Sequence, residues 1–170
     1  MHARTIEVVP FSPLWATLFA EEQAALANLL GSDVRIHHIG STAVPGLAAK
    51  PIIDILVEMP RVEQLDLHTT ALRALGYEPR GENGILGRRY FVKGRGRRTH
   101  QLHAFEAGSH DVHRHLALRD FLRSNDEARD AYAAVKHRAV AACGGDIHVY
   151  VALKHDFVGA LEAKALTDRP

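Results

Sequence analysis

The sequence has a single cysteine, almost no net charge and no long apolar run, and each scarcity excludes a class of protein. Cys143 alone cannot form an internal disulfide, which fits a reducing compartment. The formal net charge of +1, from 21 basic and 20 acidic side chains, provides no bulk attraction to nucleic acid or an anionic membrane. No apolar run reaches the about 20 residues of a membrane-spanning helix, and the first residues lack an apolar signal region. We therefore expect a cytoplasmic protein without membrane binding or dedicated DNA or RNA binding.

Composition and hydrophobic periodicity predict one domain that spans residues 1–170. A hydrophobic fraction of 46% is ordinary for a globular protein and leaves enough apolar surface for a core. Runs rich in β-branched residues alternate with stretches of helical spacing, and the last third is helical throughout. This order favours an α/β or α+β domain with one central mixed β-sheet flanked by helices. The predicted strands are Thr5–Val9, Val34–Ile39, Ile52–Glu58, Arg88–Val92 and Arg98–Phe105, and the predicted helices are residues 13–30, 65–75, 111–123, 126–142 and 147–165.

The most informative stretch is HIGSTAVPGLAAKPIIDILVEM, residues 38–59, in which a glycine-containing loop joins two predicted strands. Loops of this kind often hold phosphate groups. The spacing does not match a Walker A loop, because five residues separate Gly40 from Gly46 and Pro51 follows Lys50 where a serine or threonine should bind magnesium. The sequence therefore excludes this type of ATPase site.

A different phosphate site fits the same residues. Gly40 permits a sharp turn after the first strand, and Ser41 and Thr42 supply hydroxyl groups and backbone amides. Strand alternation places Lys50 and Asp54 on one face, where the aspartate needs a cation, a metal or hydrogen-bond donors because burying it unpaired is costly. Two interpretations stay open: a ligand site built on Ser41 and Asp54, or a structural ion pair between Asp54 and Lys50.

These residues resemble the signature of a known family. The segment GSTAVPGLAAKPIIDILV resembles that of the GrpB family, which belongs to the nucleotidyltransferase-fold superfamily. Residues 11–15 resemble the family's N-terminal aromatic-Pro-Trp helix, and Arg98-Thr99-His100 with His103 resembles its central histidine-containing strand. Tyr150, with Lys154 and Phe157, resembles its last helix. The resemblance implies a nucleotidyltransferase-like mixed sheet with the Gly-Ser loop beside its active edge.

What the resemblance implies for activity is narrower. Nucleotidyltransferases generally follow Gly-Ser with two carboxylates spaced Asp-x-Asp/Glu, which together with a third hold two metal ions. Here Asp54 is the nearest carboxylate, but Ile52 stands two residues before it and Leu56 two residues after it, so half of the metal pair is missing. A related domain occurs fused to dephospho-CoA kinase, which implies a role in supporting a nucleotide-cofactor enzyme.

A second group of candidates lies on the predicted strands after residue 88. Alternation places His103 on the opposite face from His100, so His103 alone can join Asp54 from a neighbouring strand. The two side chains could bind one divalent cation (magnesium, manganese or zinc) or act as acid and base. Arginine forks suit phosphate, which makes Arg88 and Arg98 candidate ligand residues, and we add Lys154 in the last predicted helix.

Two functions remain from the sequence. The first is a domain that binds a nucleotide or another phosphorylated metabolite, with divergent nucleotidyl or phosphoryl transfer that uses one metal as its candidate activity. Its candidate residues are Asp54 and His103 for catalysis and metal binding, and Gly40, Ser41, Thr42, Lys50, Arg88, Arg98 and Lys154 for the phosphate or ligand. The alternative is a non-catalytic module that binds and supports a partner such as a dephospho-CoA kinase.

Overall fold

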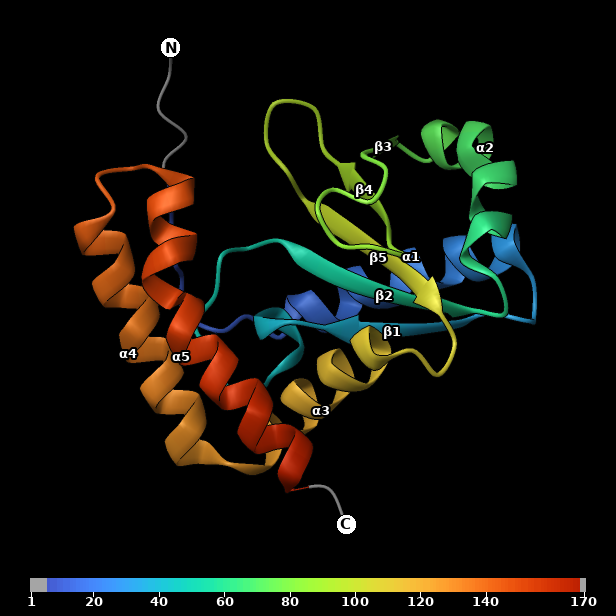
Figure 1. Ribbon diagram of the computed structural model, residues 1–170. Helices are drawn as coiled ribbons and strands as arrows, with labels where there is room; N and C mark the ends of the chain where they lie inside the picture. Colours follow the sequence, from blue (N-terminus) through green and yellow to red (C-terminus); the bar gives the residue numbers. More distant parts are fainter. Residues whose placement is uncertain (1–5, 169–170) are drawn as a thin grey trace.

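The computed structural model describes residues 6–168, whose strands form one five-stranded mixed sheet with helices on both faces (Figure 1). The strand order is β1-β2-β5-β4-β3, and only β2 and β5 run parallel to each other. The parallel pair occupies the centre, where the apolar runs of the sequence are most continuous. The strands are β1 (Arg35–Ile39), β2 (Ile53–Met59), β3 (Tyr77–Pro79), β4 (Arg89–Lys93) and β5 (His100–Glu106).

Alternation along β2 explains how the sheet is covered. Ile53, Ile55 and Val57 point to one face and join the main core with α1 (Leu14–Leu30). On the other face Leu56 is fully buried and packs with Val112 near the start of α3 (His110–Ser124). Asp54 precedes Leu56 on this second face, and the helices that follow α3 bound the space in front of the aspartate.

The C-terminal third forms three helices that pack on one another beside the sheet (Figure 1). They are α3, α4 (Asp126–Ala142) and α5 (Ile147–Thr167). Backbone N–H groups in their first turns donate hydrogen bonds to the side chains of Ser109, Asn125 and Asp146, as expected for residues of these types before a helix. The helical prediction for this third of the chain is confirmed. Helices α4 and α5 lie at the end of the sheet where β1 leads into the Gly-Ser loop.

Two predicted elements differ from the structure. Thr5 lies outside the described residues, and residues 6–9 form only one bridge, from Val9 to Ala49, because the loop around Ala49 is not itself a strand. The helix predicted over 65–75 is a 3₁₀ helix, η2 (Val62–His68), followed by the short α2 (Thr69–Ala74). Val62 and Leu65 of η2 and Leu72 of α2 are buried in the main core. Packing of this kind can override helical propensity.

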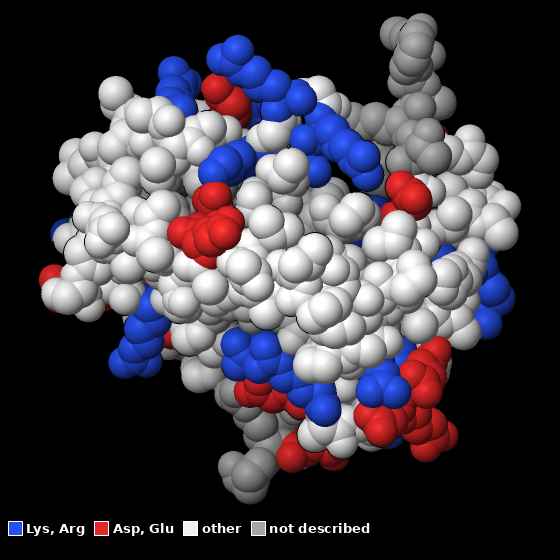
Figure 2. All heavy atoms as spheres, turned by 180° about the vertical axis from the view of Figure 1, so that it is seen from behind, with Lys and Arg blue, Asp and Glu red and all other residues white. Residues whose placement is uncertain are grey.

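The surface agrees with the low net charge. On the face opposite to that of Figure 1, basic and acidic side chains lie next to one another around a broad uncharged middle (Figure 2). Anion binding therefore depends on a local cluster rather than on a charged face. Among the described residues no helix is both long and apolar enough to span a membrane.

Candidate functional site

The Gly-Ser loop turns sharply where β1 ends. Gly40 has φ +72° and ψ −171°, a conformation that is essentially restricted to glycine. A Cβ atom at this position would lie 2.7 Å from Oδ2 of Asp54, so the loop backbone rests directly against the aspartate. The 3₁₀ helix η1 (Ser41–Ala43) follows at once. The turn predicted at Gly40 is confirmed, and its reason is now specific: only glycine lets Ser41 and Asp54 share one site.

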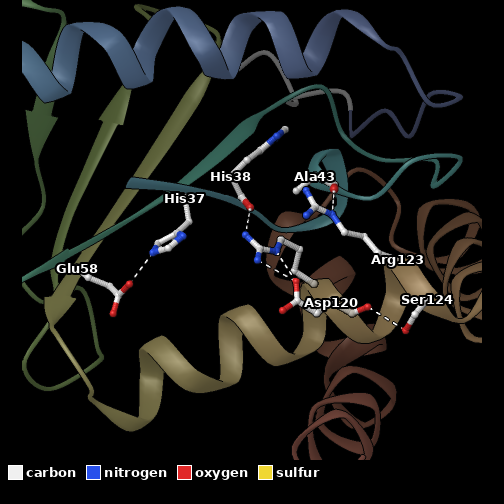
Figure 3. A network of polar contacts seen from close by, with 8 residues as sticks. His37, His38, Ala43, Glu58, Asp120, Arg123 and Ser124 are labelled. Atoms are coloured by element: carbon white, nitrogen blue, oxygen red, sulfur yellow. Dashed lines mark hydrogen bonds and ion pairs between the residues drawn. The ribbon is translucent and has the colours of Figure 1, made fainter. Parts of the chain in front are cut away.

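Polar contacts from α3 hold this loop from behind (Figure 3). Arg119 donates to the carbonyl of His38 at 3.2 Å, and Arg123 donates to the carbonyl of Ala43 at 2.8 Å. A hydrogen bond of 2.9 Å joins the His38 ring to the hydroxyl of Thr42, which is buried. Burial, with the nearby Arg123 guanidinium, lowers the pKa of His38 to about 4. His38 is therefore neutral at physiological pH and fixes Thr42, whose hydroxyl is committed to the loop.

A cavity of about 230 Å³ lies in front of Ser41 and Asp54. Its walls come from the Gly-Ser loop, the segment that leads into β2, one residue of β5 and the facing sides of α4 and α5. Parts of the chain more than 100 residues apart thus meet at one site. The lining residues are Gly40, Ser41, Thr42, Ala49, Lys50, Ile52, Asp54, Gln101, Tyr132, Lys136, Tyr150 and Lys154.

The last two helices, α4 and α5, each place a tyrosine and a lysine in this cavity with the same spacing. The segment Tyr132-Ala-Ala-Val-Lys136 lies in α4 and Tyr150-Val-Ala-Leu-Lys154 lies in α5. Residues four apart are neighbours on a helix face, and in both helices the ammonium group lies 4.3 Å from the centre of the tyrosine ring. Lys50 approaches the Tyr150 ring from the loop at 5.3 Å. Three lysines therefore face one cavity.

Lys136 is the most deeply placed of the three. Only 2% of its surface is exposed, and its ammonium group donates to Oγ of Ser41 and to the carbonyl of Ala48. Burial, reinforced by Lys154, lowers its pKa to about 7. Burial and Lys50 lower the pKa of Lys154 to about 8, and burial also lowers that of Lys50. The lysines of this site are therefore desolvated and repel one another, and an anion would offset both effects.

Asp54 pairs with His103, as strand alternation predicts. Nε2 of His103 lies 3.1 Å from Oδ1 of Asp54, while His100 points to the other face of the sheet, toward Glu22 and Lys93. Within residues 6–168 no ion pair joins Asp54 to Lys50, so the structural pair considered from the sequence is absent. Lys50 acts on Asp54 only through longer-range attraction.

The two candidate arginines lie outside the cavity lining. Arg88 is buried and donates to the carbonyls of Glu82 and Asn83, with its guanidinium carbon 4.7 Å from the centre of the Tyr90 ring. Its guanidinium N–H groups therefore stabilise the loop before β4. Arg98 lies close enough to lower the pKa of Lys50 and is half-buried two residues before β5. Of the two, Arg98 is better placed to meet a ligand that extends out of the cavity.

The donor set does not fit a resident metal ion. Asp54 and His103 could supply two ligands, but catalytic zinc sites use three protein ligands and two-metal sites use more carboxylates. Leu56 is a fully buried core residue, and the residues that face Asp54 and Leu56 across β5 are Gln101 and His103. The part of the chain that the structure describes contains no group of three His, Cys, Asp or Glu side chains able to hold a metal. Three lysines line the same cavity, and their positive charges oppose the binding of a metal cation.

Sequence reasoning missed Tyr132, Lys136 and Gln101. Lys136 resembles any charged residue of an amphipathic helix, and nothing local marks it as buried. One signal was available, because Tyr-x-x-x-Lys recurs at 132–136 and 150–154 with both lysines near the helix middles. Lys154 was chosen for its resemblance to the family, and the structure places it in the cavity.

The comparisons with known proteins agree with this architecture. The family model described as "GrpB protein" matches residues 5–164. The chain belongs to the GrpB family. It is 40% identical over 163 residues to the protein YqkA of Bacillus subtilis (strain 168), covering 95% of this chain and 48% of YqkA, so the chain spans about half the length of that relative. The crystal structure of the conserved protein GrpB from Enterococcus faecalis has 39% identity and a TM-score of 0.91, covering 95% of this chain and 98% of that one.

More distant similarities support the fold. The Cid1 poly(U) polymerase with MgGTP bound has a TM-score of 0.56 at 17% identity, covering 77% of this chain and 44% of that protein. At this identity the likeness establishes the nucleotidyltransferase-like fold alone, with its C-terminal helices. A protein named dephospho-CoA kinase from Mycolicibacterium paratuberculosis (strain ATCC BAA-968 / K-10) is 28% identical, covering 88% of this chain and 43% of the relative.

Proposed function

We propose that this GrpB-family domain binds a nucleotide or another phosphorylated metabolite in the cavity between the Gly-Ser loop and helices α4 and α5. The observation that carries the proposal is the convergence of Lys50, Lys136 and Lys154 on one cavity that contains a single carboxylate, Asp54. The cluster carries an electrostatic cost, because burial and mutual repulsion lower the lysine pKa values, and phosphate oxygens are suitable partners for such lysines.

The size of the cavity indicates which part of the ligand it takes. Its volume of about 230 Å³ is below the about 300–1,000 Å³ that encloses a drug-sized ligand. The phosphate end would therefore lie inside, against Ser41 and the lysines, and the remainder would lie outside. Arg98 is a candidate contact for that outer part. Any magnesium, manganese or zinc would arrive with the phosphates, because the protein offers too few ligands of its own.

Thermal-shift measurements with nucleotides, coenzyme A precursors and sugar phosphates test this proposal. We expect one or more of these compounds to raise the melting temperature of the wild type and to have much less effect on the Ser41→Ala, Lys50→Ala double variant. The matched control is Ser124→Ala, Lys164→Ala, since both residues are exposed and lie outside the cavity. The proposal is wrong if the two double variants respond alike.

A second candidate function is a non-catalytic module that supports a partner enzyme. The loss of the second metal-binding carboxylate favours it, because Leu56 is part of the core and not a solvent-facing substitute. The relative named dephospho-CoA kinase, of which this chain covers 43%, suggests the kind of partner. We expect the domain to retain a nucleotide-cofactor kinase in a pull-down with purified proteins. Measurable turnover of a phosphorylated substrate by the isolated domain would contradict this second candidate.

A further inference from the structure

The cavity combines the fold of a metal-dependent enzyme family with a set of side chains that opposes metal binding. Asp54 is the only carboxylate among the lining residues, and its Oδ1 atom is already paired with Nε2 of His103. Three lysines line the same space. A divalent cation held beside Asp54 would meet their repulsion, whereas a phosphate group would be attracted by all three.

We propose that this site binds the doubly charged terminal phosphate of a monoester or polyphosphate directly, with the ammonium groups of Lys50, Lys136 and Lys154 in place of a divalent cation. The inference rests on the proposed function and deepens it by naming the chemical group that is recognised and the means of neutralising its charge. Asp54 then limits the positive charge of the site rather than holding a metal.

Charge balance explains the preference for two negative charges. With three ammonium groups and one carboxylate, the fully protonated lining carries a net charge of +2, from +3 and −1. A terminal phosphate carries about two negative charges near neutral pH, whereas a phosphodiester carries one. The lowered pKa values of Lys136 and Lys154 also mean that binding draws protons into the site, because a bound dianion favours the charged forms of both lysines.

Titration calorimetry with four probes tests this inference. AMP and cyclic AMP share a base and a sugar but differ in phosphate charge, and ATP and inorganic phosphate extend the set. We expect AMP, ATP or inorganic phosphate to bind in EDTA, with no gain in affinity when Mg²⁺, Mn²⁺ or Zn²⁺ replaces the chelator. We also expect cyclic AMP to bind about tenfold more weakly than AMP, or not at all, since it lacks one charge.

The outcomes separate this inference from the proposed function. Binding that requires a divalent cation, or equal affinities for AMP and cyclic AMP, overturns the inference and leaves the proposed function standing. Failure of every probe to bind, inorganic phosphate included, overturns both. Proton uptake, measured by repeating the titration in buffers of different ionisation enthalpy, is expected to accompany binding near pH 8 and to fall in a Lys136→Met variant.

Asp54→Asn supplies a second test in which the sign of the effect decides. If no metal is held, the substitution removes a repulsive charge from the phosphate site and tightens binding of the bound probe by about fivefold or more. If Asp54 holds a metal, the same change weakens binding. Glu58→Gln is the matched control, because Glu58 lies on the same face of β2 but bonds to His37 and is not part of the cavity (Figure 3). Weaker binding in Asp54→Asn alone overturns the inference.

Discussion

Replacing Lys136 with methionine is expected to change the free energy of unfolding, relative to the wild type, more favourably at pH 7 than at pH 9. The difference between the two pH values is expected to be about 2 kcal/mol. Methionine keeps the length of the apolar stem and removes the ammonium group. In the folded wild type this lysine has a pKa of about 7, against 10.5 for an ordinary lysine. Between those two values the unfolded chain binds the proton more strongly, so the contribution of Lys136 to stability rises with pH. Methionine abolishes that contribution.

The pH dependence arises from the surroundings of Lys136. Burial is the largest cause of the lowered pKa, and the ammonium groups of Lys154 on α5 and Lys50 before β2 act in the same direction. Asp54 in β2 partly opposes them. The methionine variant also loses the hydrogen bonds to Ser41 and Ala48, but that loss is present at both pH values and cancels in the comparison.

Urea unfolding at pH 7 and pH 9 measures this effect directly. Lys164→Met is the matched control, because Lys164 lies on α5, is exposed and is not part of the cavity. It should give the same stability difference from the wild type at both pH values. A Lys136→Met variant whose difference from the wild type is also independent of pH would show that Lys136 is fully charged in the folded protein. The electrostatic cost ascribed to the lysine cluster would then be absent.

The sequence was sufficient for the part of the site that is local in the chain. Gly40, Ser41, Thr42, Lys50 and Asp54 lie within 15 residues, and turn chemistry with strand alternation places them together. The pairing of Asp54 with His103 was also accessible, because alternation fixes the face of each residue once two strands are adjacent. Adjacency of β2 and β5 was the only added assumption.

The other half of the cavity depends on the packing of helices, which local patterns do not specify. Whether a lysine on an amphipathic helix is solvated or buried depends on where that helix crosses its neighbours. Tyr132 and Lys136 meet the Gly-Ser loop only because α4 packs against α5 beside β1. Arg88 is the converse case, since a basic residue in a predicted strand suggested a phosphate ligand, whereas in the structure it donates to loop carbonyls.

Gly40→Ala is expected to be the most damaging single-methyl change in this region, with a loss of about 2–5 kcal/mol in the free energy of unfolding. Two costs add. The backbone at φ +72° and ψ −171° is unfavourable for alanine, at about 1–3 kcal/mol. The new methyl group would also lie 2.7 Å from Oδ2 and 3.2 Å from Cβ of Asp54, so the loop or the aspartate must move. Because Ser41 follows directly, we expect the phosphate site to be lost as well.

Gly31→Ala measures the first cost by itself, because Gly31 has nearly the same backbone, with φ +85° and ψ −171°, and no atom within 4 Å of the added methyl group. It should therefore show the conformational strain alone, about 1–3 kcal/mol, and leave the binding of phosphorylated probes unchanged. The excess loss in Gly40→Ala, measured by urea unfolding, then reports the contact with Asp54. Equal losses in the two variants would mean that the loop can move away from the aspartate at little cost. That result would mean that the closeness of Ser41 and Asp54 does not depend on a glycine at position 40.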